Sequence, residues 1–115
     1  MVAAGWAVLA TSGYATDTPK LIRVATYNAS LYRKDAGQLA SDLATRENLQ
    51  AKKIAEIIQR VRPDILLINE IDYQSDGVPP RLLRDHYFSV SQNGLNPIEF
   101  PHIYAPPSNL SLIHI

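Results

Sequence analysis

Two apolar segments separated by a long amphipathic stretch constrain the fold of this chain more than any other feature. Residues 21–27 are rich in β-branched and aromatic side chains, and residues 65–68 are continuously apolar, so each segment predicts a strand. Residues 46–62 place apolar side chains at helical spacing, and Pro63 ends the helix because it disfavours helical geometry before it. We therefore expect an α/β fold that begins β-α-β, with parallel strands and the second strand covered on both faces.

Polar residues follow both predicted strands. Asn28 comes directly after the first strand, and Glu70 follows the second strand after one intervening Asn. Parallel neighbours joined by a right-handed crossover end at the same edge of a sheet, which is where α/β proteins usually place their ligands. We therefore expect Asn28 and Glu70 to lie close together.

The chemistry of these residue types favours a site for a divalent cation and a phosphate. Magnesium is held by one or two carboxylates while it keeps waters and takes up phosphate oxygens, so Glu70 is a candidate ligand. The amide of Asn28 could orient that carboxylate or donate to a phosphate without adding negative charge. Asp72 would share the face of Glu70 if the strand continued, and could assist through water. Alternatively, Asn28 caps a turn and Glu70 is a solvated carboxylate.

Residues 22–28 and 64–72 resemble the endonuclease/exonuclease/phosphatase superfamily, whose members cut phosphoester bonds with a divalent metal. The resemblance covers residues 21–109 and is strongest to secreted bacterial members of uncertain substrate. It implies that Asn28 and Glu70 are catalytic and that Glu70 binds Mg²⁺ or Mn²⁺. It also implies a two-sheet α/β sandwich, of which residues 20–109 would form the N-terminal portion, incomplete as given.

The same resemblance calls for elements that this sequence lacks: an Asp-x-Asn segment, a late catalytic His paired with Asp, and further strands. Asp85-His86 lies early, beside a predicted helix end, so we interpret His86 as a surface or packing residue, and His102 and His114 likewise. We expect metal-dependent phosphoester hydrolysis by the full-length protein, acting on nucleic acid, a nucleotide or another phosphoester. For the chain itself we expect little or no activity, because it offers no general base.

Two other functional classes stay open. A non-catalytic binding module could retain the strands without acid/base residues. A flavodoxin-like doubly wound domain would also begin β-α-β, but it should carry a Gly-rich phosphate loop after the first strand, and none follows. Charge does not choose between them, because 11 Lys and Arg balance 11 Asp and Glu, and no protein partner is indicated. The absence of cysteine excludes disulfides and thiolate metal sites.

The other elements follow from local patterns. We expect short helices at residues 38–43 and 81–85, a strand at 87–90, and turns at 76–80 and 92–97. The basic pairs Lys52-Lys53 and Arg60-x-Arg62 are interpreted as the solvated face of the helix.

The two ends carry no Asp, Glu, Lys or Arg and need separate explanations. Residues 1–15 resemble the back half of a secretion signal, with an apolar run and a small-x-small pattern up to Ala15, although no basic residue precedes it. The run is too short to span a membrane, so we expect a secreted or periplasmic protein. A frayed apolar terminus is the alternative.

Residues 110–115 follow a Pro-rich loop without a linker. They match the translation of one frame of a common transposase-type sequencing adapter, so we interpret them as a library artefact. The alternative is a genuine apolar C-terminal strand.

Overall fold

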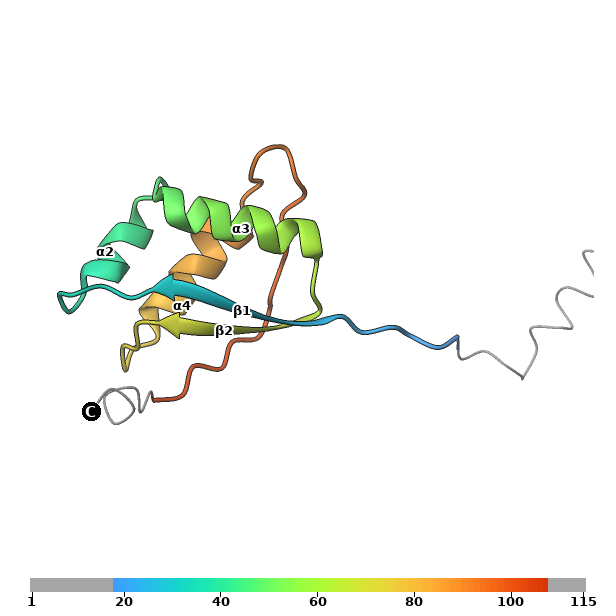
Figure 1. Ribbon diagram of the computed structural model, residues 1–115, viewed down its shortest axis with the longest axis horizontal. Helices are drawn as coiled ribbons and strands as arrows, with labels where there is room; N and C mark the ends of the chain where they lie inside the picture. The colour runs from blue at the N-terminus through green and yellow to red at the C-terminus, as the bar shows by residue number, and fades with distance from the viewer. Residues whose placement is uncertain (1–17, 108–115) are drawn as a thin grey trace, which may run out of the picture.

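The computed structural model describes residues 18–107, and the predictions for residues 1–15 and 110–115 lie outside this range. The elements follow one another in the order β1 (Val24–Leu31), α2 (Gln38–Ala44), α3 (Leu49–Val61), β2 (Ile65–Ile71), α4 (Val78–Leu83) and the π-helix η1 (Arg84–Phe88) (Figure 1). The predicted α/β class is confirmed. The short helix expected at 38–43 is α2, and the helix expected at 81–85 is divided between α4 and η1.

The sheet consists of β1 and β2, which pair in parallel and are connected through α3. This confirms the predicted β-α-β unit. Pairing begins with Val24 beside Ile65, and just before it the backbone N–H of Arg23 donates to a carboxylate oxygen of Asp64 over 2.8 Å. The first strand therefore starts three residues later than predicted, because residues 21–23 lie beyond the end of the partner strand.

Helix α3 begins and ends at specific caps. The side chain of Asn48 accepts a hydrogen bond from the backbone N–H of Ala51 over 2.9 Å, so the helix starts at Leu49 and not at residue 46 as predicted. At the other end, Arg62 adopts a left-handed conformation with φ 55° and its N–H donates to the carbonyl of Ile58. Pro63 follows directly, as the sequence indicated.

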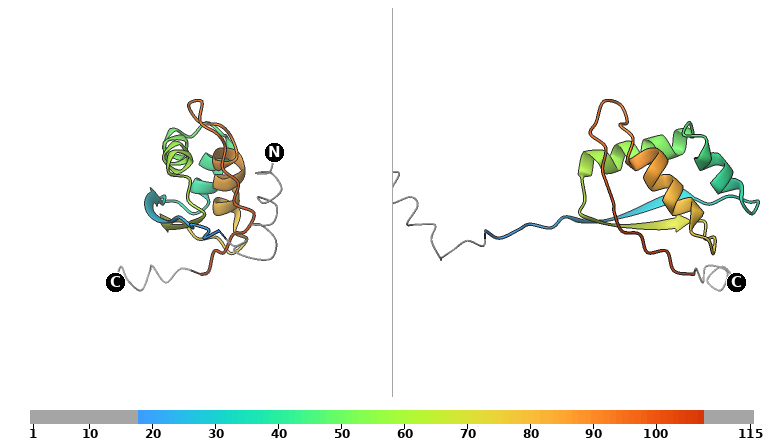
Figure 2. Two further views of the ribbon diagram at one scale, coloured as in Figure 1. Left: turned by 90° about the vertical axis from the view of Figure 1, so that its right-hand side faces the viewer. Right: turned by 180° about the vertical axis from the view of Figure 1, so that it is seen from behind.

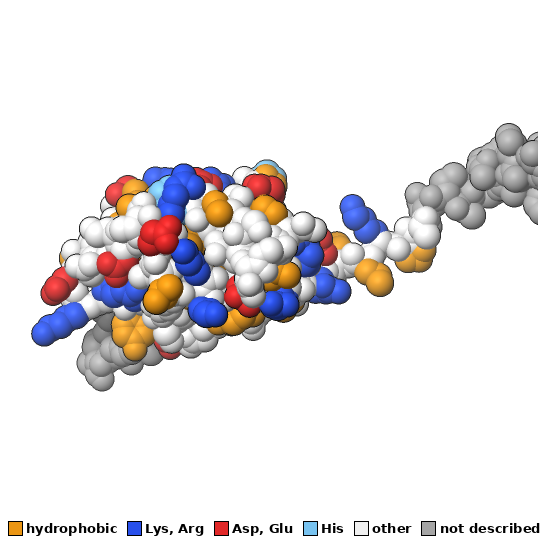
Figure 3. Space-filling view, turned by 90° about the horizontal axis from the view of Figure 1, so that it is seen from above, with side chains coloured by type: hydrophobic (Ala, Val, Ile, Leu, Met, Phe, Trp, Pro, Cys, Tyr) orange, Lys and Arg blue, Asp and Glu red, His pale blue; other side chains and the backbone are white. Residues whose placement is uncertain are grey.

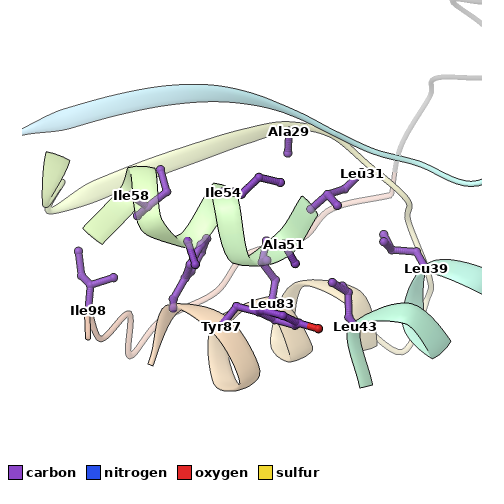
Figure 4. Close-up of a cluster of buried hydrophobic side chains, with 12 residues drawn as sticks. Ala29, Leu31, Leu39, Leu43, Ala51, Ile54, Ile58, Leu83, Tyr87 and Ile98 are labelled. Carbon is purple, nitrogen blue, oxygen red and sulfur yellow. The ribbon is translucent and has the colours of Figure 1, made fainter. Parts of the chain in front are cut away.

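The helices all lie on one side of the sheet (Figures 1 and 2). The buried side chains of α3 pack between the sheet, which contributes Ala29 and Leu31, and η1, which contributes Tyr87 and Phe88 (Figure 4). Leu39 and Leu43 of α2 close the core at the end of α3 (Figure 4). The opposite face of the sheet is exposed in residues 18–107, so the prediction that β2 is covered on both faces is wrong for this part of the chain.

The strand predicted at residues 87–90 is wrong. Tyr87 and Phe88 are the last residues of η1, and both are buried. The buried side-chain amide of Gln59 donates to the carbonyls of Phe88 (3.0 Å) and Val90 (2.8 Å), and its oxygen accepts from the N–H of Gln92 (3.0 Å). Gln59 thus satisfies backbone groups that a neighbouring strand would otherwise pair, and the burial of both aromatic rings outweighs their strand propensity.

Turn geometry follows the sequence more closely. The N–H of Leu95 donates to the carbonyl of Gln92 over 2.9 Å, which confirms a turn within residues 92–97. The expected turn at 76–80 is shorter, because Gly77 takes a left-handed conformation and α4 starts at the next residue, with its two prolines in the first turn.

The outer surface of the helical side carries charges of both signs, interspersed without a single-sign patch (Figure 3). Lys52 pairs with Glu47 at 2.8 Å and Arg60 with Glu56 at 3.1 Å, as expected of a solvated helix face. Arg62 differs, because its guanidinium donates to the carbonyls of Asn96 and Pro97 and ties the end of α3 to the 92–97 turn. No helix within residues 18–107 is long and apolar enough to cross a membrane.

Candidate functional site

Both strands become irregular where the sequence places its polar residues. Regular pairing stops at Asn28, which lies beside Asn69, and resumes only at the last residue of each strand. Between these points Ser30 has φ 49° and Glu70 has φ 58°, so both strands pass through a left-handed residue that is not glycine. Such a conformation costs roughly 1–2 kcal/mol, and strain of this kind concentrates at functional sites.

Asn28 forms a local turn. Its side-chain oxygen accepts hydrogen bonds from the N–H of Ser30 over 3.1 Å and from the Ser30 hydroxyl over 3.3 Å. The turn-capping role is therefore present. The side-chain NH₂ group of Asn28 makes no hydrogen bond within the part of the chain that is described, so it can still donate to a ligand.

Glu70 lies one residue beyond the partner of Asn28 and is exposed. Within residues 18–107 its carboxylate takes part in no hydrogen bond or ion pair, unlike the carboxylates of Asp64 and Asp72. The two candidate residues thus occupy the same edge of the sheet, at successive register positions. Their catalytic and metal-binding roles stay predictions.

Asp72 has a structural role at this edge. Its N–H donates to the carbonyl of Leu31 over 2.8 Å, and its carboxylate accepts from the N–H of Arg33 over 2.9 Å. The expectation that it shares a face with Glu70 required a continuing strand, but β2 ends at Ile71 and the left-handed Glu70 interrupts the alternation. Asp72 therefore stabilises the position of the segment that follows β1.

Two residues that the sequence analysis did not single out hold the irregular end of β1 in place. The side-chain NH₂ of Gln50, in the first turn of α3, donates to the carbonyls of Ala29 (3.2 Å) and Ser30 (2.9 Å). Arg33 donates to the Gln50 side-chain oxygen over 3.0 Å and pairs with Asp42 at 2.8 Å. No sequence signal separates these residues from other polar positions, because the contacts depend on how the helix sits over the strand.

This polar network also affects ionisation. The hydrogen bond from Arg33 to Asp42, together with one from Gln38, holds the pKa of the Asp42 carboxyl below its ordinary value. Asp42 therefore stays charged to lower pH than a free aspartate and keeps Arg33 in position.

His86 does not contribute to this edge. Its Nδ1 lies 3.2 Å from the carbonyl oxygen of Leu43, and the ring is half-buried between η1 and α2. This supports the interpretation of His86 as a packing residue. His102 is exposed, and His114 lies outside the described residues.

The residues at the sheet edge fit a divalent cation only as part of a site. Nowhere within residues 18–107 do three or more His, Cys, Asp or Glu side chains gather as a metal cage would require. Magnesium, however, is bound in many enzymes by one or two carboxylates plus waters and substrate phosphates. The unpaired carboxylate of Glu70 meets that requirement, so it fits as one ligand.

A groove of about 610 Å³ runs along β2 and reaches Glu70 at one end. Its walls are the strand itself, apolar side chains of η1 such as Phe88, and the extended segment formed by residues 102–107. Phe100 anchors that segment by an edge-to-face contact with Phe88, at a ring separation of 5.7 Å. The candidate metal residue therefore lines a largely apolar groove and does not lie on a flat surface.

A parallel β-α-β unit defines an α/β protein, and the strand ends, where Asn28 and Glu70 lie, are the place where such folds usually bind ligands. The family model described as the Endonuclease/Exonuclease/phosphatase family matches residues 25–111, which include β2, all of β1 except Val24, and both candidate residues. The chain belongs to this family, whose members are phosphoester hydrolases that generally use divalent metals. No curated protein and no solved structure matches the chain.

Proposed function

We propose that the full-length protein is a metal-dependent phosphoester hydrolase, in which Glu70 binds Mg²⁺ or Mn²⁺ and Asn28 contacts the substrate phosphate. The observation that carries this proposal is the state of Glu70. Its carboxylate is exposed and unpaired in the described part of the chain, and its backbone is left-handed at the sheet edge, one residue beyond the partner of Asn28. The family membership supports the reaction class.

Different residues of the chain contribute to binding of the metal and of the phosphate. Glu70 provides a negatively charged oxygen ligand, and the free NH₂ of Asn28 can donate to a phosphate oxygen without repelling it. Gln50 and Arg33 fix the irregular end of β1 and so orient Asn28. When bound, the divalent ion supplies positive charge that stabilises the phosphate and the leaving oxygen.

We assign no general base for proton transfer among residues 18–107. His86 is occupied by its contact with the Leu43 carbonyl, and the carboxylate of Asp72 at the same edge is engaged by the backbone N–H of Arg33. We therefore expect the chain to bind metal weakly and to show very little hydrolysis of a phosphodiester such as bis(4-nitrophenyl) phosphate. Metal-dependent turnover by this chain alone would contradict that expectation.

Metal binding can be tested without measuring activity. Mn²⁺ broadens NMR signals of nearby nuclei, so titration should first broaden the amide signals of Asn28, Asn69 and Glu70, and Glu70→Gln should abolish this selective effect. Glu47→Gln is the matched control, because Glu47 is an exposed glutamate that pairs with Lys52 on α3. Selective broadening that persists in Glu70→Gln, or that maps to another carboxylate, would refute the proposed ligand.

We also propose that the protein is exported, on the sequence pattern of residues 1–15. Expression in a bacterial host with these residues present should yield a periplasmic or secreted product that lacks them, and its intact mass would show cleavage after Ala15. A cytoplasmic product that retains the residues would contradict export.

A further inference from the structure

A second hollow, of about 400 Å³, lies next to the groove that reaches Glu70. Its walls come from the 75–77 loop, α4, η1 and the segment around residues 103–105. Two arginines, Arg81 and Arg84, line it, and we call it the arginine hollow. Arg84 and Ile103 also line the groove, so the two cavities share a wall.

The two arginines differ in what they bind. Arg84 donates to the carboxylate of Asp85 over 2.6 Å and to the carbonyl of Phe100 over 3.4 Å, and the Asp85 contact raises the pKa of Arg84. Arg81 makes no side-chain hydrogen bond and no ion pair within residues 18–107. Its planar set of N–H donors is therefore available to a ligand.

The carboxylates around the hollow are already engaged. Asp76 accepts from the N–H of Val78 over 3.0 Å and caps the local turn, and Asp85 pairs with Arg84. Neither lies within ion-pairing distance of Arg81. The charge of Arg81 is thus the one at this hollow that lacks a direct partner in the described part of the chain.

Gly77 leaves room for the Arg81 guanidinium beside the 75–77 loop. A Cβ atom at position 77 would come within 3.0 Å of Nη1 of Arg81, and the residue has φ 69°, a conformation that favours glycine. The absence of a side chain at position 77 therefore lets the guanidinium lie against the loop, facing the hollow. On the other side the hollow is lined by Ile103 and Ala105, and it is open to solvent, since both of these residues and Arg81 are exposed.

We propose that the arginine hollow binds a phosphate group through Arg81, as a site distinct from the one at Glu70. The hollow adjoins the groove that reaches Glu70, so one ligand can occupy both. The inference that one ligand occupies both cavities rests on the proposed function. The substrate is then a phosphoester that carries a further phosphate group, and not a simple monoester. Arg81 is a specificity residue in this arrangement, since it holds the phosphate that does not react.

The test uses inorganic phosphate as the probe, with the whole chain in EDTA and at constant ionic strength. The NMR signals of the Arg81 Nε–H and the Gly77 N–H should shift and saturate in the millimolar range. Arg81→Gln should weaken binding about tenfold or more, because it removes a charge-assisted contact. Arg46→Gln is the matched control, since Arg46 is exposed, lines neither cavity and should leave the affinity unchanged. Shifts that never saturate, or equal affinity in Arg81→Gln, would overturn the proposal.

Two further variants separate this site from the candidate metal site. Gly77→Ala should also weaken phosphate binding, though less than Arg81→Gln does, because the new Cβ shifts the end of the flexible Arg81 side chain without removing its charge. Glu70→Gln should leave phosphate binding unchanged. Loss of phosphate binding in this variant would place the phosphate at the strand ends and overturn the proposal. If Mn²⁺ fails to reach Glu70 while phosphate still binds at Arg81, the proposed function fails and the phosphate site stands.

Discussion

The two faces of the β1–β2 sheet differ in what covers them. On the inner face, Leu31 is 0% exposed and Ala29 is 4% exposed, and both contact the helical core (Figure 4). On the outer face, Val24 is 64% exposed and Leu67 is 57% exposed, although both are as apolar as the inner residues. The first four residues of β2 are therefore apolar on both faces, but the strand is covered on one face within the described residues.

This difference shows that a continuously apolar strand is not necessarily buried on both faces. An antiparallel sheet with one solvated face alternates apolar and polar residues, whereas a parallel sheet covered on both faces is continuously apolar. Ile65 to Ile68 follow the second pattern. The sequence of β2 thus suits a strand between two layers, as in the two-sheet sandwich expected of this family, while residues 18–107 supply one of those layers.

The largest effect should come from the inner face. Leu31→Ala removes a side chain that is fully buried against the helices, and we expect the free energy of unfolding to fall by about 2–5 kcal/mol. Urea unfolding followed by circular dichroism measures this. A loss below about 1 kcal/mol would show that the inner face is not a packed core.

A smaller loss should follow from the polar contact inside that core. Gln59→Leu introduces an apolar side chain of similar size but leaves the carbonyl of Val90 and the N–H of Gln92 without their partner. We expect a decrease of about 1–3 kcal/mol in the same urea experiment. Faster hydrogen exchange at Gln92 would locate the change, and unaltered exchange there would contradict this account of η1.

The network that fastens the end of β1 should respond to pH. The pKa of Asp42 is lowered in the folded state, so its contribution to stability is present above the unfolded pKa and is lost as the pH falls through the folded pKa. The unfolding free energy of the native chain should therefore decline below about pH 4, and Asp42→Asn should reduce that decline. Identical pH profiles for the two proteins would argue against the Arg33–Asp42 contact in solution.

The smallest effect should come from the outer face. Leu67→Ala is the same chemical change as Leu31→Ala, yet we expect it to alter the unfolding free energy by about 0.5 kcal/mol or less, because Leu67 is largely exposed. The pair of Leu→Ala variants therefore measures the difference between the faces directly. A loss at Leu67 comparable to that at Leu31 would mean that the outer face is covered in solution.

Periodicity predicted the parts of the fold that depend on local pattern. The apolar run before Glu70, the helical spacing before Pro63 and the order β-α-β needed no knowledge of tertiary contacts. The error at Tyr87 and Phe88 came from the opposite case, because the polar partner of that segment, Gln59, lies in α3, 28 residues before Tyr87. Single-residue strand propensity contains no information about such a partner.

The candidate site was predictable in position but not in detail. Asn28 and Glu70 were identified from where the apolar runs stop, and the parallel register places them at one edge. The left-handed conformations of Ser30 and Glu70 arise where the two strands, which have different numbers of residues between their paired positions, resume pairing. The sequence of one strand alone does not predict this irregularity. The role of Gln50 in holding that edge depends on the docking of α3, which pattern alone does not give.

The left-handed backbone at Glu70 has a consequence for how this protein would evolve in the laboratory. Glycine, or less readily asparagine, relieves the strain of a positive φ, so a library selected only for resistance to unfolding should enrich glycine at position 70. A library selected for metal binding should retain glutamate there. The same position would then give opposite outcomes under the two selections, as expected where a side chain is kept for its chemistry at the expense of its backbone.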